Sequence, residues 1–572
     1  MRVVINKVLI FIPALLVGLC CLSPVGHAQV LAPSADPGRV DRPPIAEKIL
    51  SDLLPEITLK SSKPDLPPDM VNVTFVLNSL TLKGARAFSA KELSRFYQPL
   101  LGKTIDLKQL YGIMLQIQQL YLDEGYTVSK VFLPEQSIEN GNITFVVLEG
   151  FVAKVNIDPS FPKSSILDDF ATKVLAMRPL NTKKLERLML ILNDNHGLNA
   201  SAVLSKSDTL IATDLSGLNL RLIRNSNKES DPSPYLSFDN YGSNYIGSGQ
   251  WGLGTGFNHV GIPYSELFLS GTMTTSSQEM KQGNISYHLP LFGVSGTTLR
   301  LSSEINRTEP GGSLDDLDVQ GKSMNLSAQI SYPIIRQRDK TWLVSGQFEY
   351  KNVGTDLLGD PLFRDRIRSV GVTSRYSFSD SHDGLNFIQG SLSKGLDILA
   401  ARETGSPDLS RLQGHSDFLK AEFIYTRLQA IPNNFDLLFS FASQYAWDPL
   451  LSSEEFGFGG GYVGRGYDPS EITGDRGFST SLELRYNKTL PEWKAALQPY
   501  IFYDFGKIWN IDSLDKTVVS AASAGAGFRL NFNDSWVIGC NFAIPLTMTP
   551  NNPPQYGHEY GGRILFSLKK EF

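Results

Sequence analysis

The C-terminal part of the chain is a succession of short runs in which apolar and polar residues alternate. Such alternation is typical of β-strands with two unlike faces, because successive side chains point to opposite sides of a strand. No helical stripe interrupts the runs after Pro234. The sixteen predicted strands are Pro234–Tyr241, Ser248–Val260, Glu266–Thr275, Lys281–Leu291, Thr297–Arg307, Lys322–Ile334, Thr341–Val353, Arg366–Phe378, Leu385–Ile398, Phe418–Ala430, Phe435–Leu450, Phe478–Leu490, Ala495–Trp509, Val518–Phe532, Trp536–Leu546 and Gly561–Phe572.

The number and spacing of these runs predict a transmembrane β-barrel over residues 234–572. Connections as short as Gly293–Gly296 and Pro432–Asn434 alternate with long ones. An even number of strands, joined by short turns at one end and longer loops at the other, is typical of bacterial outer-membrane barrels. A soluble β-sandwich is the alternative, but it would rarely reach sixteen strands or place aromatic residues repeatedly near strand ends, as at Tyr332 and Tyr425.

The first residues have the order of a secretory signal. A basic start, the apolar core Val8–Leu22 and the small residues of Gly26-His27-Ala28 predict a signal peptide over residues 1–28. A lipoprotein signal is the competing interpretation, but Leu19 before Cys20 is too large for that processing site. With this helix removed, the mature chain is expected to span a bilayer only as a closed barrel, since lipid satisfies no backbone hydrogen bonds.

Residues 29–70 are rich in proline and are interpreted as a linker that contains one short helix. Ile45, Ile49 and Leu53 recur at helical spacing, and Pro55 ends the pattern. The prediction is an amphipathic helix over Ile45–Leu54. The alternative is an unanchored segment in which a helix forms only in part.

Two α/β modules are predicted between this linker and the barrel. Residues 71–150 follow the order β-α-α-β-β, with a capping box at Ser89 and Glu92 and a longer helix that begins after Asp106. That helix is expected to bury a stripe of apolar side chains against the core, and Asn140-Gly141 is expected to join the last two strands as a hairpin. The predicted stripe is Leu110, Met114, Ile117 and Leu120. Residues 151–226 repeat the order, with strands at Val152–Ile157, Ser201–Leu204 and Thr209–Leu222 and helices at Ser164–Ala176 and Thr182–Asn195.

One glycine-dense stretch, residues 456–477, lies between two predicted strands and carries Arg465 at its centre. Loops of this length without periodicity are usually either functional or disordered, and strands on both sides favour a functional role. On the following strand, Tyr503 and Phe505 share one face while Asp504 points to the other.

Composition narrows the possible functions. A formal net charge of −5 with 19% charged residues argues against a strongly basic nucleic-acid binder. The seven histidines show no metal-ligand spacing, and of the three cysteines only Cys540 lies outside the predicted signal. The glycine-rich stretch does not lead from a buried strand into a helix, so it is no phosphate-binding loop. No nucleophile motif stands out, and we expect neither an enzyme nor a metal or other cofactor.

Two groups of motifs resemble the TpsB transporters of two-partner secretion, the haemolysin secretion/activation proteins. One group is GRGY, DRG and YDFG around the glycine-rich stretch; the other is GYTVSKVFLPEQ with GNITFVVLEG in the first module. TpsB proteins belong to the BamA-like superfamily of outer-membrane barrels with periplasmic POTRA domains. The resemblance implies that 71–150 and 151–226 are POTRA domains and that the predicted helix with Ile45, Ile49 and Leu53 plugs the barrel.

The resemblance also implies a site. The loop 456–477 would fold into the barrel, where Arg465 would meet Asp504, with Glu483 as a possible second acid. Gly464, Gly466, Tyr467 and Gly506 complete the loop motif, and Leu133, Pro134 and Gln136 form a substrate-side motif in the first POTRA domain. The family usually has an aliphatic residue where this chain has Gly464, and we therefore expect a looser loop tip.

By this resemblance the protein would export a secreted TpsA-type exoprotein, an adhesin or haemolysin, across the outer membrane of a Gram-negative bacterium. The POTRA domains would capture the unfolded partner by strand pairing, and folding outside would replace ATP as the driving force. Other expected partners are outer-membrane lipid, periplasmic chaperones and the barrel-assembly machinery; nucleic acid is not expected. The alternative is a factor that inserts other outer-membrane proteins, and a passive porin ranks third.

Overall fold

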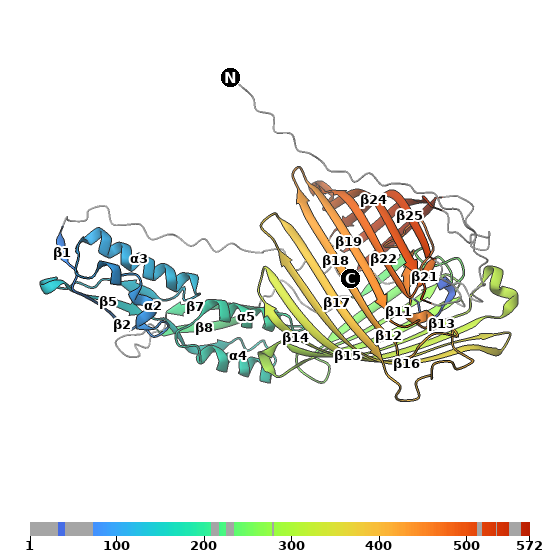
Figure 1. The fold of residues 1–572 in the computed structure, drawn as a ribbon, viewed down its shortest axis with the longest axis horizontal. Coiled ribbons are helices and arrows are strands. Elements are labelled where there is room, and N and C mark those ends of the chain that lie inside the picture. The colour runs from blue at the N-terminus through green and yellow to red at the C-terminus, as the bar shows by residue number, and fades with distance from the viewer. Residues whose placement is uncertain are drawn as a thin grey trace, which may run out of the picture.

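The computed structural model describes residues 33–39, 73–206, 217–224, 234–276, 279–511, 518–533, 535–547 and 562–572. Two α/β modules lie in a row at one end of the molecule, the second next to the large barrel that forms the other end (Figure 1). The predicted signal peptide and the predicted helix Ile45–Leu54 lie outside the described residues. Before the first module, the structure describes only a short segment with the 3-10 turn η1 (Pro33–Ala35).

The first module contains the predicted strands and helices around a small core, with one more strand before the first helix and another, β3, between the helices. Its elements are β1 (Thr74–Val76), β2 (Ser79–Lys83), α2 (Ala90–Ser94), η2 (Gln98–Leu100), β3 (Thr104–Asp106), α3 (Leu107–Asp123), β4 (Lys130–Phe132), η3 (Glu139–Gly141) and β5 (Asn142–Leu148). The sheet order is β2-β5-β4, and β1 pairs with β3. Capping boxes begin both helices, at Ser89 with Glu92 and at Asp106 with Gln109.

Two details of this module differ from the sequence prediction. The buried face of α3 is Leu110, Ile113, Ile117 and Tyr121, because the Tyr121 hydroxyl donates to buried Glu149 (2.9 Å) and turns the helix toward it. Asn140-Gly141 does not close a tight hairpin, since β4 already ends at Phe132. Pro134 has no N–H to continue a ladder, and the Gln136 side chain instead exchanges two hydrogen bonds with the Thr144 backbone (2.8 Å each).

The second module packs two helices against one three-stranded sheet. Its elements are β6 (Phe151–Ile157), α4 (Ser165–Leu175), α5 (Thr182–Asn193), β7 (Ala200–Lys206) and β8 (Gly217–Arg224). The order is β6-β8-β7, with β6 parallel and β7 antiparallel to β8, so β7 lies at an edge. None of the described helices is both long and apolar enough to cross a bilayer.

The barrel is closed and has sixteen strands, as predicted, with β22 and β23 acting as one interrupted strand against β24. Its strands are β9 (Tyr235–Asp239), β10 (Gln250–Asn258), β11 (Glu266–Thr274), β12 (Met280–Leu291), β13 (Thr297–Thr308), β14 (Gln320–Arg336), β15 (Lys340–Leu357), β16 (Asp360–Ser379), β17 (Gly384–Gly395), β18 (Leu419–Ile431), β19 (Phe435–Ala446), β22 (Arg476–Tyr486), β23 (Lys488–Leu490), β24 (Ala495–Trp509), β25 (Val518–Phe532), β26 (Trp536–Pro545) and β27 (Arg563–Glu571). Neighbours in sequence pair antiparallel, and β27 pairs with β9 to close the wall.

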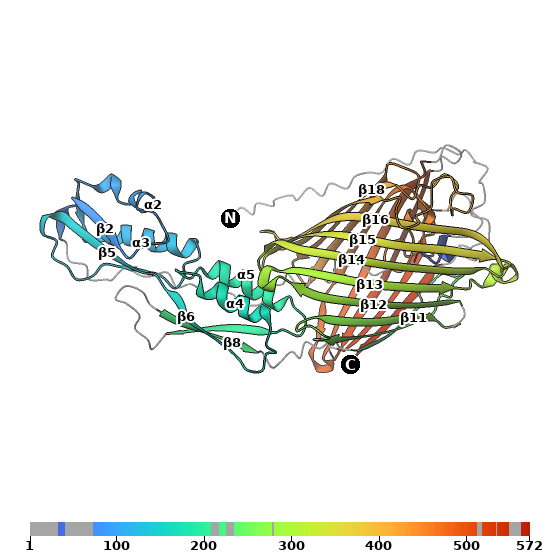
Figure 2. The same ribbon diagram turned by 90° about the horizontal axis from the view of Figure 1, so that it is seen from below.

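The second module sits against the short turns of the barrel (Figure 2). The Val294 N–H, between β12 and β13, donates to Asp169 (2.8 Å), and Arg187 donates to the Pro333 carbonyl at the end of β14 (2.8 Å). Burial raises the pKa of Asp169, but hydrogen bonds from Lys173 and Val294 outweigh it and hold the pKa below its usual value. The end of the barrel away from the modules is called the outer end below.

Candidate functional site: the inward loop and the module edge

The stretch 456–477, called the inward loop, connects β19 to β22 and folds into the barrel from the outer end. A short antiparallel hairpin forms its stem, β20 (Phe456–Phe458) with β21 (Ile472–Gly474). Phe458, Tyr467 and Ile472 bury their side chains against Ile508 of β24. This packing places the tip of the loop, with Arg465, against the inner wall formed by β22, β24 and β25.

At the tip, the Arg465 guanidinium forms a bidentate pair with Asp504 of β24. Nε donates to Oδ2 (3.0 Å) and Nη2 to Oδ1 (2.9 Å), and the backbone N–H groups of Gly464 and Arg465 also donate to Oδ2 (3.1 Å each). Asp504 is fully buried. Two parallel charge-assisted bonds define both the position and the orientation of an arginine. The contact therefore holds the loop tip in one place.

Glu483, on the neighbouring strand β22, is a second carboxylate in the same site. It accepts from Arg465 (2.8 Å), from Arg485 (2.6 Å) and from Arg529 of β25 (2.6 Å). The Arg465 guanidinium also lies over the Phe502 ring at 3.4 Å. Three guanidinium groups and two carboxylates thus share one cluster, which is buried except for the half-buried Arg529, and in it Glu483 joins the loop tip to the wall arginines.

This cluster is both buried and hydrogen-bonded. Burial lowers the pKa of Arg465, but its bonds to Asp504 and the charges of Asp504 and Glu483 outweigh that effect and raise the pKa above the usual value. Removing one partner of a buried pair leaves the other charge uncompensated, which destabilises by about 3–5 kcal/mol. The pair therefore resists separation unless another charged or polar group replaces one of its members.

The motif glycines let the loop approach the wall closely. Gly464 is buried with φ +75°, and a Cβ there would lie 2.9 Å from the Gly459 backbone. A Cβ at Gly466 would lie 2.8 Å from Cβ of Ser523, and one at Gly506 would lie 2.3 Å from the Phe458 ring. Gly464 turns the backbone so that its own N–H reaches Asp504. A tip looser than that of the family stays a prediction.

Tyr467 ties the loop to the last strands of the barrel. Its hydroxyl lies 2.9 Å from the Ala522 carbonyl and 2.5 Å from the Thr547 carbonyl, and its own carbonyl accepts a hydrogen bond from Arg563 of β27. Arg563 also pairs with Asp468 (3.2 Å). The loop is therefore fixed to β24 through Asp504 and to β27 through Arg563.

The N-terminal segment 33–39 lies inside the outer end of the barrel. The Pro37 carbonyl accepts from Asn306 (2.8 Å) and Ser323 (2.9 Å), and Arg39 pairs with Glu455 at the stem of the inward loop (2.9 Å). Arg411, from the loop between β17 and β18, pairs with Glu455 (3.0 Å) and with Asp475 on the other side of the stem (2.5 Å). One acidic stem therefore binds both the N-terminal segment and an outer loop.

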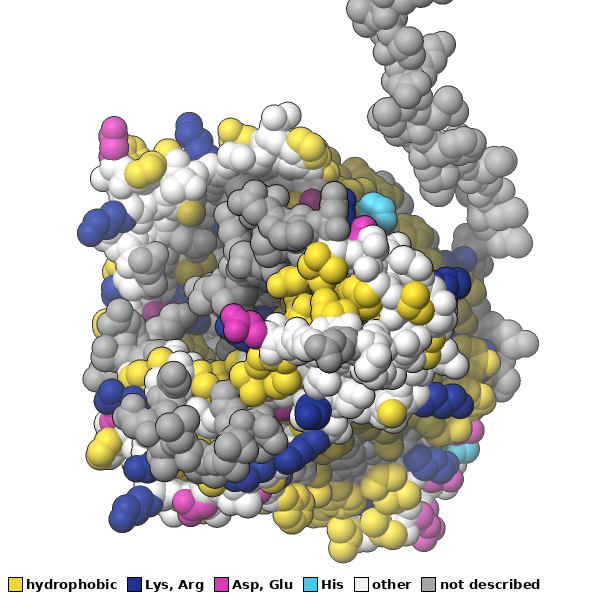
Figure 3. Space-filling model, turned by 90° about the vertical axis from the view of Figure 1, so that its left-hand side faces the viewer, with side chains coloured by type: hydrophobic (Ala, Val, Ile, Leu, Met, Phe, Trp, Pro, Cys, Tyr) yellow, Lys and Arg dark blue, Asp and Glu magenta, His cyan; other side chains and the backbone are white. Residues whose placement is uncertain are grey.

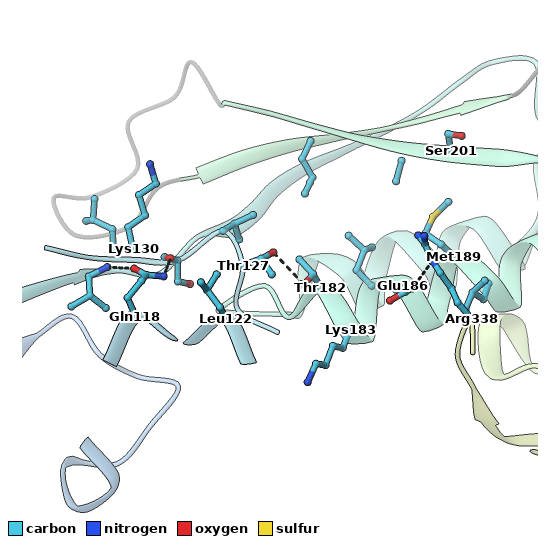
Figure 4. Close-up of a pocket in the computed structure, with 18 of the residues that line it drawn as sticks. Gln118, Leu122, Thr127, Lys130, Thr182, Lys183, Glu186, Met189, Ser201 and Arg338 are labelled. Carbon is cyan, nitrogen blue, oxygen red and sulfur yellow. Dashed lines mark hydrogen bonds and ion pairs between the residues drawn. The ribbon is translucent and has the colours of Figure 1, made fainter. Parts of the chain in front are cut away.

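A groove of about 1440 Å³ lies between the two modules (Figure 4). Gln118 and Lys130 lie at one end and Arg338 at the other, and strand β7, which carries Ser201, lies opposite helix α5. Hydrophobic side chains are open on this end of the molecule (Figure 3), and among them Phe132 lines the groove. The groove thus combines apolar surface with the edge strand β7.

The start of β7 shows which of its backbone groups are available. Asn193 bonds both the N–H and the carbonyl of Ala200 (2.8 and 3.0 Å), so these two groups point away from β8. In an antiparallel ladder alternate residues share this direction, which applies to Ala202 and Leu204. Gln118 caps β4 in the same way, with bonds to Val131 N–H (2.8 Å) and the Ser129 carbonyl (3.1 Å). Of these two edges, β7 therefore offers the longer open one.

The residues of the predicted POTRA motif take a different place. Leu133, Pro134 and Gln136 line a small cavity on the first module, and the Gln136 amide already bonds Thr144. Their role toward a substrate stays a prediction. Among the described residues, no cluster of three His, Cys, Asp or Glu side chains could hold a metal ion.

Sequence reasoning missed several members of the site. Arg485 could have been found, because it lies two residues after Glu483 and so shares its face. Arg529 could not, since its position opposite Glu483 depends on the register of β24 with β25. Arg39 and Arg411 reach the site from segments without strand periodicity, and nothing in their spacing pointed to it.

Comparison with known proteins agrees with this architecture. The family of haemolysin secretion/activation proteins ShlB/FhaC/HecB matches residues 220–530, and the ShlB-type POTRA domain matches residues 75–150. The chain is 26% identical over 479 residues to the heme/hemopexin transporter protein HuxB of Haemophilus influenzae, covering 81% of this chain and 82% of that protein. The solved structure of CdiB from Escherichia coli shares the fold, with a TM-score of 0.76 at 17% identity, over 92% of this chain and 96% of that one. CdiB from Acinetobacter baumannii gives a TM-score of 0.63 at 18% identity, with 92% and 96% covered.

Proposed function

The chain belongs to the haemolysin secretion/activation protein family ShlB/FhaC/HecB, and we propose a route by which its partner crosses the barrel. As a member of this family it is an outer-membrane transporter of two-partner secretion, with its POTRA domains in the periplasm. The match to secretion transporters also makes the alternative, a factor that inserts other barrels, the weaker one. We further propose that the protein has no enzymatic role.

Capture begins at the open edge of β7. The N–H and carbonyl groups of Ala202 and Leu204 can pair with an extended segment of the partner, as strands add to exposed sheet edges elsewhere. Phe132 and the apolar side chains of α3 and α5 along the groove would contact alternate side chains of that segment. An unfolded exoprotein suits this surface, because an extended chain presents unpaired backbone N–H and carbonyl groups along its length.

Passage then follows the lumen. The second module lies directly at the short turns of the barrel, so a captured segment is already at the entrance. A cavity of about 800 Å³ borders Arg465 inside the barrel and is lined by polar residues of several strands, including Thr426 and Ser440. The inward loop and the N-terminal segment 33–39 both occupy the barrel interior, and both would have to shift to open a continuous path.

The observation that carries this proposal is the Arg465 cluster, which joins the inward loop to the wall in the interior of a secretion barrel. Release of the loop needs charged or polar groups that can replace its partners, and a passing polypeptide brings such groups in its backbone. Folding of the partner outside would make the step irreversible without ATP. The partner is proposed to be a large exoprotein of the adhesin or haemolysin type.

The expected result of deleting the gene is loss of one exoprotein from the medium. Any large secreted protein encoded beside it should be absent outside the cell and return when the full chain is supplied. Other outer-membrane barrels should keep their normal amounts, as measured by quantitative mass spectrometry of outer membranes. A general fall in these barrels with undiminished export of the neighbouring protein would instead favour the assembly function.

A further inference from the structure

Three basic residues form one row on the outer surface of the barrel, at its outer end. Arg307 of β13 is the register partner of Lys281 in β12 and of Lys322 in β14. Their neighbours Asn306 and Ser323 point into the lumen, because both bond the Pro37 carbonyl there. Successive residues of a strand face opposite sides, so Arg307 and Lys322 point away from the lumen, and Lys281 shares their face.

The row lies where the outer wall changes from apolar to charged. Ile305 lies on the same face of β13, two residues closer to the modules than Arg307, and is 53% exposed. Ile285 lies on the same face of β12, four residues closer to the modules than Lys281, and is 54% exposed. Open apolar side chains on the outside of a membrane barrel face the hydrocarbon of the bilayer. The three basic residues therefore lie at the level of the outer-leaflet headgroups, on the part of the wall that faces the viewer in Figure 2.

The charges of this row are not neutralised within the described part of the chain. Lys281, Arg307 and Lys322 are exposed, and none has an ion-pair partner among the described residues. Arg364 of β16, in contrast, pairs with Asp356, so its charge is neutralised and it does not belong to the row. The nearby loop acids Asp315, Asp316 and Asp318 lie beyond the row, farther from the bilayer.

Strand spacing gives the row the dimensions of a phosphorylated headgroup. Adjacent strands lie about 4.8 Å apart, so three neighbouring cations extend over roughly 10 Å. Arg366 of β16 adds a fourth cation nearer the modules, in the register row of Ile305, Met324 and Asn352. Lysine and arginine are the side chains that bind phosphate, lysine as a point charge and arginine through its fork.

We propose that Lys281, Arg307 and Lys322 form a binding site for the phosphate groups of an outer-leaflet glycolipid. The acyl chains of the same molecule would lie along Ile285 and Ile305, so one ligand satisfies both parts of the surface. Basic clusters beside a bilayer recognise anionic headgroups in this way, with about 1 kcal/mol for each lysine or arginine. This site is separate from the inward loop and does not depend on the export route.

The test compares two triple variants of the full chain, purified in detergent, by native mass spectrometry. One is K281Q/R307Q/K322Q, and the matched control is K340Q/K488Q/K494Q at the module end of the barrel. The probe is diphosphoryl lipid A, with dephosphorylated lipid A and inorganic phosphate as separate arms. We expect the outer triple variant to bind diphosphoryl lipid A about 100-fold more weakly than the parent and the control variant to bind it normally.

Each arm can overturn the assignment. Equal affinity of the parent for dephosphorylated lipid A would mean that only the acyl chains are recognised, and displacement by inorganic phosphate at matched concentration would identify a simple anion site. Undiminished binding by the outer triple variant would place the lipid elsewhere. If that variant does not fold, R307Q alone, at the centre of the row, is expected to weaken binding about 5-fold, and unchanged binding by it would equally contradict the site.

Discussion

Export of the partner exoprotein is expected to fall at least about tenfold when Arg465 is replaced by alanine, while the barrel stays in the membrane. The substitution leaves Asp504 buried without its counter-ion, at a penalty of about 3–5 kcal/mol that displaces the loop tip from the wall. Since the anchored position would lose more than tenfold in population, the loop could no longer hold one resting geometry. The measurement is partner in the medium for each unit of folded barrel.

Two comparisons make this result specific to the anchor. Arg465→Lys keeps the charge but cannot bridge Asp504 and Glu483 with a fork, so we expect export between that of the parent and of the alanine variant. Arg476→Ala removes an arginine at the C-terminal end of the same loop, where β22 begins. This arginine lies over Tyr445 and bonds the Ala446 carbonyl, and the variant should export normally. Normal export by folded Arg465→Ala would show that the cluster is merely structural.

A proline at position 202 is expected to reduce export about tenfold by blocking strand addition. The Ala202 N–H points away from β8, so its removal leaves the native ladder intact. An incoming strand would lose that hydrogen bond and meet the proline ring, together about 1–3 kcal/mol. The measurement is the affinity of the purified chain for the N-terminal secretion domain of the exoprotein, followed by export in cells.

Matched variants separate capture from folding in this experiment. Ala202→Thr keeps the N–H and should bind like the parent, whereas Val203→Pro removes a hydrogen bond to β8 and should unfold the second module. Circular dichroism of the isolated variants in detergent distinguishes the two effects. Full affinity of a well-folded Ala202→Pro chain would exclude the edge of β7 as the capture site.

The alternation of apolar and polar residues predicted the barrel strands but not where the longest of them end. Alternation identified all sixteen strands, because a strand between lipid and lumen must keep two unlike faces along its length. The outer ends of the long strands were missed. β15 continues to Leu357, past the predicted end at Val353, and β16 begins at Asp360, before the predicted start at Arg366. Beyond the hydrocarbon the outward face becomes charged, so the alternation of apolar and polar residues disappears.

The site was only partly accessible from the sequence. The resemblance pointed to Arg465 and Asp504, and the structure brings them together with Glu483 in one buried cluster. The role of this cluster in export stays a proposal. Arg529 and the open groups of Ala202 depend on which strands pair and in which register, and no local pattern contains that information. The outward row of Lys281, Arg307 and Lys322 was hidden for the same reason, as its members lie on three strands.

The inward loop and the N-terminal segment share a link that gives the route a physical order. Arg39 binds Glu455, and Arg411 binds both Glu455 and Asp475, so the segment and the outer loop hold the two sides of the same stem. Movement of the N-terminal segment would free Glu455 from one of its two partners while Arg411 still holds the stem. The Arg465 cluster would keep its partners during that movement, because they lie on β22 and β24 and not on the N-terminal segment.

The central claim is that the partner passes through the barrel beside Arg465, and photo-crosslinking during export tests it most directly. A photoreactive residue replaces Thr426 or Ser440, which line the lumen cavity, or Phe423 or Ile501, whose side chains are exposed on the outer wall. Crosslinks from both lumen positions to the exoprotein, with none from the two wall positions, are the predicted result. Continued export with crosslinks only at Phe423 or Ile501, and none in the lumen, would contradict the account.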